Sequence, residues 1–139
     1  MIHPDPNYFK IPGNLRAMIA MPSSMRNTVT KGQVLEKWVE NNTGAKRTKA
    51  SGALHGNGDL VSTCNGTSFY IECKYLSKEG ETYLLQSDWK KACNQASRLN
   101  RVPVVVTSTM THGAFYYKDI DEIRKLPLSK LSSIIGEKK

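Results

Sequence analysis

The most informative segment of the chain is residues 58–74, which read GDLVSTCNGTSFYIECK. Two runs rich in β-branched and aromatic residues, Leu60–Cys64 and 68–76, flank the dipeptide Asn65-Gly66. Asn-Gly is a preferred pair for two-residue hairpin turns, because both positions need a positive φ. We therefore predict a β-hairpin at this place.

This turn sets the pairing of the two strands and brings two acidic residues together. Cys64 pairs with Thr67 across a two-residue turn, and the same register continued outward sets Asp59 opposite Glu72. The Cβ atoms of such partners lie about 4.5–5.5 Å apart. Because side chains alternate between the faces of a strand, Lys74 shares a face with Glu72. Two facing carboxylates repel one another unless a cation lies between them, and Mg²⁺ prefers hard oxygen ligands of this kind.

Two acids and a lysine in this arrangement suit metal-assisted hydrolysis of a phosphodiester bond. Mg²⁺ binds through one or two carboxylates together with a phosphate, and a neighbouring lysine can offset charge on a phosphoryl oxygen. The same residues also allow a purely structural role for the two acids and the lysine. In that case Asp59 begins a strand after a glycine turn, and Glu72 and Lys74 are solvated.

Composition limits the class of protein. The chain has 139 residues, of which 39% are hydrophobic and 23% charged, and this fits one domain with a modest core. No apolar run approaches the roughly 18 residues of a membrane-spanning helix, so no membrane partner is expected. The net charge of +8 favours a polyanionic partner such as nucleic acid, or it only maintains solubility. Three widely spaced cysteines and the lack of a signal-peptide pattern indicate a cytoplasmic protein with reduced thiols.

Around the hairpin, the patterns predict an α/β domain. Residues 1–27 are rich in proline and are expected to form an N-terminal arm that could be flexible, with one helical turn around 15–21. Residues 28–139 are expected to form a single domain. A capping box, Thr30-Lys31-Gly32-Gln33, opens a helix, and basic residues follow that helix in a loop. Further strands are expected at 82–85, 102–107 and 114–118, and further helices from 87 or 88 to 99, at 120–126 and at 128–135.

The residues around the two acids resemble a known family. Gly58-Asp59-Leu60 followed by Ile71-Glu72-Cys73-Lys74 is similar to the motif of PD-(D/E)xK nucleases, with Gly58 where that motif often has proline. Lys31-Gly32, Glu36, Arg47 and Ser51-Gly52-Ala53 extend the resemblance to archaeal-type Holliday junction resolvases and related phage-encoded endonucleases. The resemblance implies a restriction-endonuclease-like core, in which helices flank a mixed central β-sheet, for a single nuclease domain.

The resemblance also implies roles for individual residues. Asp59 and Glu72 would hold the metal, with the backbone carbonyl of Cys73 as a further ligand. Lys74 would orient or activate the attacking water, and Glu36 would complete the acidic cluster from the first helix. The implied cofactor is Mg²⁺, for which Mn²⁺ could substitute. Arg47 and Ser51 would contact phosphates near the scissile bond. Lys46 and Lys49 of the basic loop are further candidate nucleic-acid contacts, and so is His55, which could instead be solvated or take part in catalysis.

These expectations together describe a metal-dependent DNA endonuclease in the cytosol of a bacterial, archaeal or phage-infected cell. Its substrate would be branched DNA such as a four-way junction, and it would act as a homodimer because two symmetric incisions resolve a junction. Gln95, on the polar face of the second long helix, could assist the site or be an ordinary surface residue. Two alternatives stay open, namely a sequence-tolerant nicking or repair nuclease of the same superfamily and a non-catalytic basic DNA-binding protein.

Overall fold

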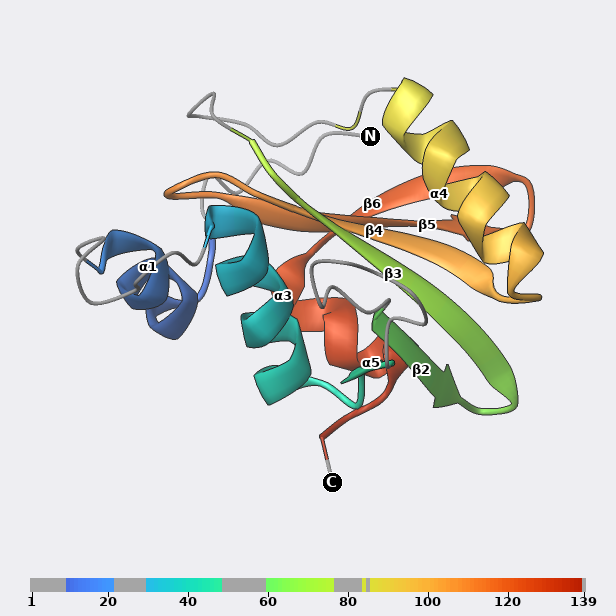
Figure 1. The fold of residues 1–139 in the computed structure, drawn as a ribbon, viewed down its shortest axis with the longest axis horizontal. Coiled ribbons are helices and arrows are strands. Elements are labelled where there is room, and N and C mark those ends of the chain that lie inside the picture. The colour runs from blue at the N-terminus through green and yellow to red at the C-terminus, as the bar shows by residue number, and fades with distance from the viewer. Residues whose placement is uncertain (1–9, 22–29, 49–59, 77–83, 85, 139) are drawn as a thin grey trace.

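A mixed six-stranded sheet lies at the centre of the molecule, with helices on both of its faces (Figure 1). The structure, a computed structural model, describes residues 10–21, 30–48, 60–76, 84 and 86–138. The α/β class and the mixed sheet flanked by helices are confirmed. The elements are α1 (Gly13–Ala20), α3 (Lys31–Asn42), β1 (Lys46–Arg47), β2 (Leu60–Cys64), β3 (Thr67–Tyr75), α4 (Gln86–Arg98), β4 (Val102–Ser108), β5 (Gly113–Asp119), β6 (Glu122–Pro127), the 3₁₀ helix η1 (Leu128–Lys130) and α5 (Leu131–Ile135).

The strands lie in the order in which they occur along the chain, from β1 to β6. β3 and β4 form the parallel pair, and α4 makes the crossover between them, whereas the other neighbours are antiparallel. The hairpin β2–β3 has the predicted register, from Cys64↔Thr67 to Leu60↔Ile71. Its turn residues Asn65 and Gly66 have φ values of 51° and 80°. Asp59 lies outside the described residues.

Helix α3 begins where the capping box predicts. The backbone N–H of Gln33 donates to Thr30 Oγ1 at 3.2 Å, and the N–H of Thr30 donates to Gln33 Oε1 at 2.9 Å. These two bonds satisfy backbone donors that the first helical turn would otherwise leave without partners. The expected apolar stripe of this helix is buried and consists of Val34, Leu35, Trp38 and Val39.

Strand β3 separates two hydrophobic clusters because its side chains alternate between the faces of the sheet. Phe69 and Ile71 pack in the larger cluster with α1, α3 and α5. On the other face, α4 packs Trp89 and Ala92 against Val105 and Tyr116 in a smaller cluster. Figure 1 shows α4 on one side of the sheet and α3 with α5 on the other.

The prediction of a helix at 120–126 is wrong, because Glu122–Pro127 forms β6, antiparallel to β5. Ile120, Ile123 and Leu126 recur every three residues as in a helix, but pairing with β5 overrides this local spacing. Lys46 and Arg47, expected in a loop, form β1. The strands expected at 102–107 and 114–118 are confirmed as β4 and β5, and the helix at 128–135 as η1 and α5. The strand expected at 82–85 lies outside the described residues except for Leu84, which is in no strand.

Part of the predicted N-terminal arm packs into the core. Ile11, Leu15 and Ile19 are buried in the larger cluster, the last two on the helix α1. The indole N–H of Trp38 donates to Asn14 Oδ1 at 3.0 Å and so ties α1 to α3. Residues 10–21 therefore contribute to the same core as the rest of the chain. In the described part of the chain, no helix is both long and apolar enough to span a membrane.

Candidate active site

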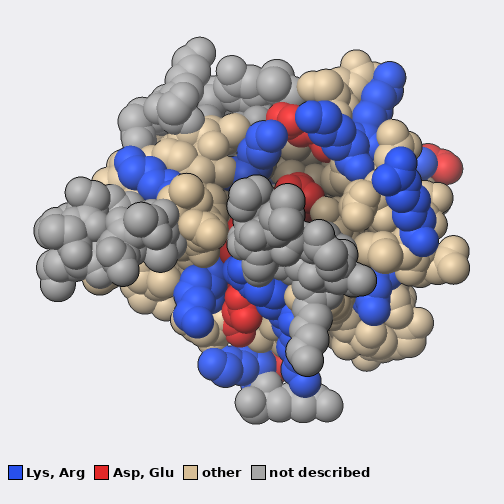
Figure 2. Space-filling view, viewed as in Figure 1, with Lys and Arg blue, Asp and Glu red and all other residues tan. Residues whose placement is uncertain are grey.

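Charged side chains gather on the face of the molecule that Figure 2 shows. Acidic side chains lie in the middle of this face, and Lys and Arg side chains lie around them. Negative charge surrounded by positive charge is the arrangement expected where a cation and a polyanion bind together.

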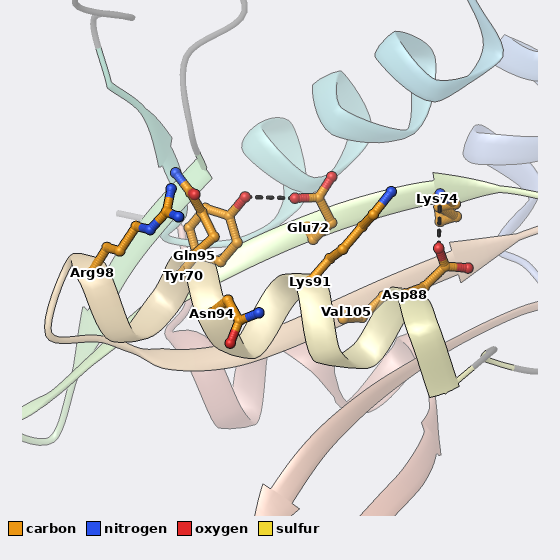
Figure 3. Close-up of a pocket in the computed structure, with 9 residues that line it drawn as sticks. All are labelled: Tyr70, Glu72, Lys74, Asp88, Lys91, Asn94, Gln95, Arg98 and Val105. Carbon is orange, nitrogen blue, oxygen red and sulfur yellow. Dashed lines mark hydrogen bonds and ion pairs between the residues drawn. The ribbon is translucent and has the colours of Figure 1, made fainter.

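A cavity of about 460 Å³ lies between α4 and the strands β3 and β4 (Figure 3). Its wall on β3 carries one carboxylate and one ammonium group, and its wall on α4 carries mostly polar and basic groups. The lining residues are Tyr70, Glu72 and Lys74 from β3, Asp88, Lys91, Asn94, Gln95 and Arg98 from α4, and Val105 from β4. The structure therefore places two of the predicted catalytic residues, Glu72 and Lys74, in one cavity.

A buried tyrosine orients the carboxylate of Glu72. Tyr70 is only 4% exposed, and its Oη donates to Glu72 Oε2 at 2.5 Å. Both residues lie on the α4 face of β3, two positions apart. A carboxylate has about four lone-pair sites, so accepting this bond leaves Glu72 able to bind a cation.

Lys74 is paired with an acid from the first turn of α4. Its Nζ lies 3.2 Å from Asp88 Oδ1, with side-chain exposures of 43% for Lys74 and 16% for Asp88. The dipole of a helix favours an acidic residue in the first turn, which stabilises Asp88 there. In Figure 3 this ion pair lies at one end of the cavity, and the Lys91 side chain extends from α4 toward β3 between Glu72 and Lys74.

Glu36 of α3 is part of a second charged group, with Glu40 and Arg47. Arg47 Nη2 lies 3.4 Å from Glu36 Oε2, and Arg47 Nε lies 3.2 Å from Glu40 Oε1. Burial raises the pKa of Glu36, Arg47 opposes this, and the negative charges of Glu72 and Glu40 add to the rise. The carboxylates of Glu36 and Glu72 therefore repel one another although they come from different elements.

Cys73 lies between Glu72 and Lys74 on the opposite face of β3 and packs against the larger cluster. Burial raises the pKa of its thiol well above the ordinary value, and the charges of Glu36 and Glu72 add to this effect. A thiol in such surroundings stays protonated and is a poor nucleophile. The side chain of Cys73 is therefore structural.

The outcomes for the other predicted site residues differ. Arg47, expected to contact phosphate, is held by two glutamates, and Lys46 is exposed on β1. Lys49, Ser51, His55 and Asp59 lie outside the described residues. Among the residues that the structure does describe, no group of three or more His, Cys, Asp or Glu side chains is arranged to hold a metal ion.

Tyr70, Asp88 and Asn94 line the cavity but were not predicted as part of the site, whereas Gln95, for which the sequence left a role open, does line it. Tyr70 could have been found from strand alternation, because it lies two positions before Glu72. Asp88, Lys91, Gln95 and Arg98 are spaced by three or four residues, the spacing that places side chains on one face of a helix. Neither pattern shows which face of α4 meets which face of β3.

A comparison of the chain with protein-family models, curated proteins and solved structures gave no match.

Proposed function

We propose that the protein is a divalent-metal-dependent DNA endonuclease of the PD-(D/E)xK type that acts on branched DNA. The observation that carries this proposal is the cavity in which Glu72 and Lys74 of β3 face the basic and amide side chains of α4. A carboxylate beside an ammonium group, opposite cationic groups, can bind a metal ion and a phosphate at the same time.

The order of the elements is compatible with a restriction-endonuclease-like core. Helix α3 precedes the hairpin β2–β3, and the parallel unit β3–α4–β4 follows. Glu72 lies in the middle of β3, and the crossover helix α4 packs on the face of the sheet that carries Glu72. On the basis of this order of elements, we also propose that the chain has a restriction-endonuclease-like core.

The oxygen donors present fit a hard divalent cation. The negative charge of Glu72 adds to the rise in the pKa of Glu36, and a divalent cation bound near both carboxylates would offset that charge. By the resemblance, Asp59 and the backbone carbonyl of Cys73 would join Glu72 as ligands, with Glu36 completing the set. Mg²⁺, or Mn²⁺ in its place, would act as a Lewis acid and lower the pKa of a bound water.

The residues of the chain itself would position the reactants. Tyr70 holds the Glu72 carboxylate in one orientation through its hydrogen bond. Lys74, held by Asp88 at one end of the cavity, would orient the attacking water or offset charge on the phosphoryl group. Lys91 and Arg98 would contact backbone phosphates, which position DNA without reading its sequence.

Substitution of the acids separates cleavage from binding. Glu72→Gln or Asp59→Asn should abolish incision in Mg²⁺ yet leave DNA affinity in EDTA unchanged or tighter, because a negative charge near the phosphates is lost. Glu137→Gln, which removes the same charge from an exposed C-terminal position, should cut like the wild type. Near wild-type cutting by Glu72→Gln would contradict the site. Wild-type protein that binds DNA but never cuts it would instead favour a non-catalytic DNA-binding protein.

A further inference from the structure

The strand β6 forms one edge of the sheet. β5 pairs with one side of it, and no described strand pairs with its outer side. The N–H and C=O groups on such an edge can form hydrogen bonds with a strand of another chain. This makes β6 a candidate surface for association.

The sequence around β6 is antisymmetric in charge. Residues 120–126 read IDEIRKL, so that two acids precede the central Ile123, two bases follow it, and an apolar residue stands at each end. In an antiparallel pair of two copies centred on Ile123, Glu122 lies opposite Arg124 of the second copy. Asp121, in the turn that precedes β6, then comes next to Lys125 of the second copy, and each of these pairs occurs twice because the arrangement is twofold symmetric.

The hydrogen-bond pattern of the hairpin β5–β6 allows this register. A two-residue turn is closed by a hydrogen-bonded pair, here Asp119 and Glu122. The next pair, Lys118 and Ile123, is then of the non-hydrogen-bonded kind, so the N–H and C=O of Ile123 point to the outer edge. Two copies of Ile123 can therefore exchange both of their backbone hydrogen bonds.

Two neighbouring registers also pair the residues whose N–H and C=O groups point outward, but they are unfavourable. One is centred on Glu122 and sets that residue opposite itself, and the other is centred on Arg124 and does the same. Like charges directly opposite each other on paired strands are destabilising. Charge therefore selects the register centred on Ile123 from the three.

The exposed residues of this edge also favour a partner. Ile120 is 85% exposed and Ile123 is 49% exposed. Ile120 has a φ of 60°, a conformation that β-branched residues rarely adopt, at a turn position where glycine is usual. Within one copy, Asp119 lies opposite Glu122, and Arg124 Nε of the same copy lies 3.2 Å from Asp119 Oδ2. In the register centred on Ile123, Glu122 would face the Arg124 of the second copy.

Charged residues on an edge strand can also protect it against pairing. Such protection requires charged residues, but it does not depend on the order of acidic and basic residues along the strand. The separation of acids and bases on either side of Ile123 instead makes two copies of the edge complementary to one another.

We propose that β6 is the surface through which two copies of this chain associate, in an antiparallel register centred on Ile123. The sheets of both copies then form one continuous sheet. Two strands, β4 and β5, lie between β6 and the β3 wall of the cavity, so the interface stands independently of the proposed nuclease reaction.

Sedimentation of the full chain without DNA or metal tests this interface. The wild type should be a dimer at tens of micromolar. Arg124→Glu should weaken dimerisation by roughly 100-fold or more, because like-charge contacts across an interface cost several kcal/mol. Glu122→Arg should do the same, and the double variant Glu122→Arg/Arg124→Glu should regain the dimer because its charges are complementary again.

Lys37→Glu on the exposed side of α3 is the matched control, since it changes the net charge as much as Arg124→Glu does and should leave the dimer intact. Circular dichroism of each variant establishes that it is folded. A wild type that is monomeric at 200 µM, an Arg124→Glu variant that dimerises like the wild type, or a folded double variant that stays monomeric would each overturn the proposal. None of these results depends on whether the protein cuts DNA.

Discussion

The hydroxyl group of Tyr70 bears most directly on the chemistry of Glu72, because it donates a hydrogen bond to the carboxylate from a buried position. Partners that orient a metal ligand typically contribute roughly 10–100-fold to metal affinity or activity. Tyr70→Phe should therefore raise the Mg²⁺ concentration for half-maximal incision by about that factor. DNA affinity in EDTA should not change, because the hydroxyl carries no charge.

A tyrosine on the other face of the sheet provides the control for this variant. Tyr117 of β5 stacks on Phe115 at 5.9 Å between ring centroids and packs against the larger cluster. Tyr117→Phe should keep the wild-type metal dependence. An unchanged metal titration for Tyr70→Phe would show that the hydrogen bond does not position Glu72 for a metal.

Glu36 makes folding stability depend on pH. Burial and the charges of Glu72 and Glu40 raise the pKa of Glu36 above its usual 4.5, in spite of Arg47. Above pH 4.5 and up to the raised pKa, the folded protein therefore binds more protons at this site than the unfolded chain does, and stability falls as pH rises. Above the raised pKa this loss is complete.

The variant Glu36→Gln removes this titration. In EDTA, the free energy of unfolding of the variant minus that of the wild type should therefore increase between pH 4 and pH 7, because only the wild type loses stability at this site as pH rises. Urea denaturation at a series of pH values measures the difference. A stability difference that is constant with pH, or that moves in the other direction, would contradict the assigned surroundings of Glu36.

At the scale of elements, the hairpin β2–β3 depends on its turn. Gly66 has a φ of 80°, and a Cβ there would meet no atom within 4 Å, so the effect of Gly66→Ala is one of backbone conformation alone. That change should lower the free energy of unfolding by about 1–2 kcal/mol. Gly13→Ala at the start of α1 is the matched control, with equally open space and no positive φ, and should be neutral or stabilising by about 0.4–1 kcal/mol. Equal effects of the two changes in thermal denaturation would contradict the turn geometry.

The elements that could be predicted from the sequence are those with a local physical cause. Asn65-Gly66 determines both the turn and the register of its strands, and Thr30 with Gln33 determines the start of α3. The apolar stripe of α3 and the β-branched run of β4 were predictable for the same reason, since each follows from the spacing of neighbouring residues.

The features that could not be predicted depend on contacts between distant segments. The spacing of Ile120, Ile123 and Leu126 favours a helix locally, and only the pairing with β5 makes this segment a strand. The ion pair of Lys74 with Asp88 joins β3 to α4 and needs the packing of that helix on the sheet. For the candidate site, the sequence therefore indicated Glu72 and Lys74 and left a role for Gln95 open, but it did not show which side chains of α4 face β3.

For the whole molecule, the net charge of +8 predicts that DNA binding weakens steeply with salt. The logarithm of the association constant should fall linearly with the logarithm of salt concentration, by about 0.9 for each phosphate neutralised on duplex DNA. Lys91→Ala and Arg98→Ala should each make this slope shallower by about one phosphate contact. Lys130→Ala, at an exposed position of η1, should leave the slope unchanged. An affinity that does not respond to salt would exclude DNA as the main partner.

Incision of an end-labelled four-way junction should be compared with incision of a linear duplex of equal length, in Mg²⁺ and in EDTA. We expect paired cuts on opposing strands of the junction in Mg²⁺, weaker cutting of the duplex, no product in EDTA, and no product from Glu72→Gln under any condition. Equal cutting of junction and duplex would remove the selectivity for branched DNA and leave a general nuclease. A wild type that binds the junction in Mg²⁺ but leaves every strand intact would contradict the proposed nuclease activity.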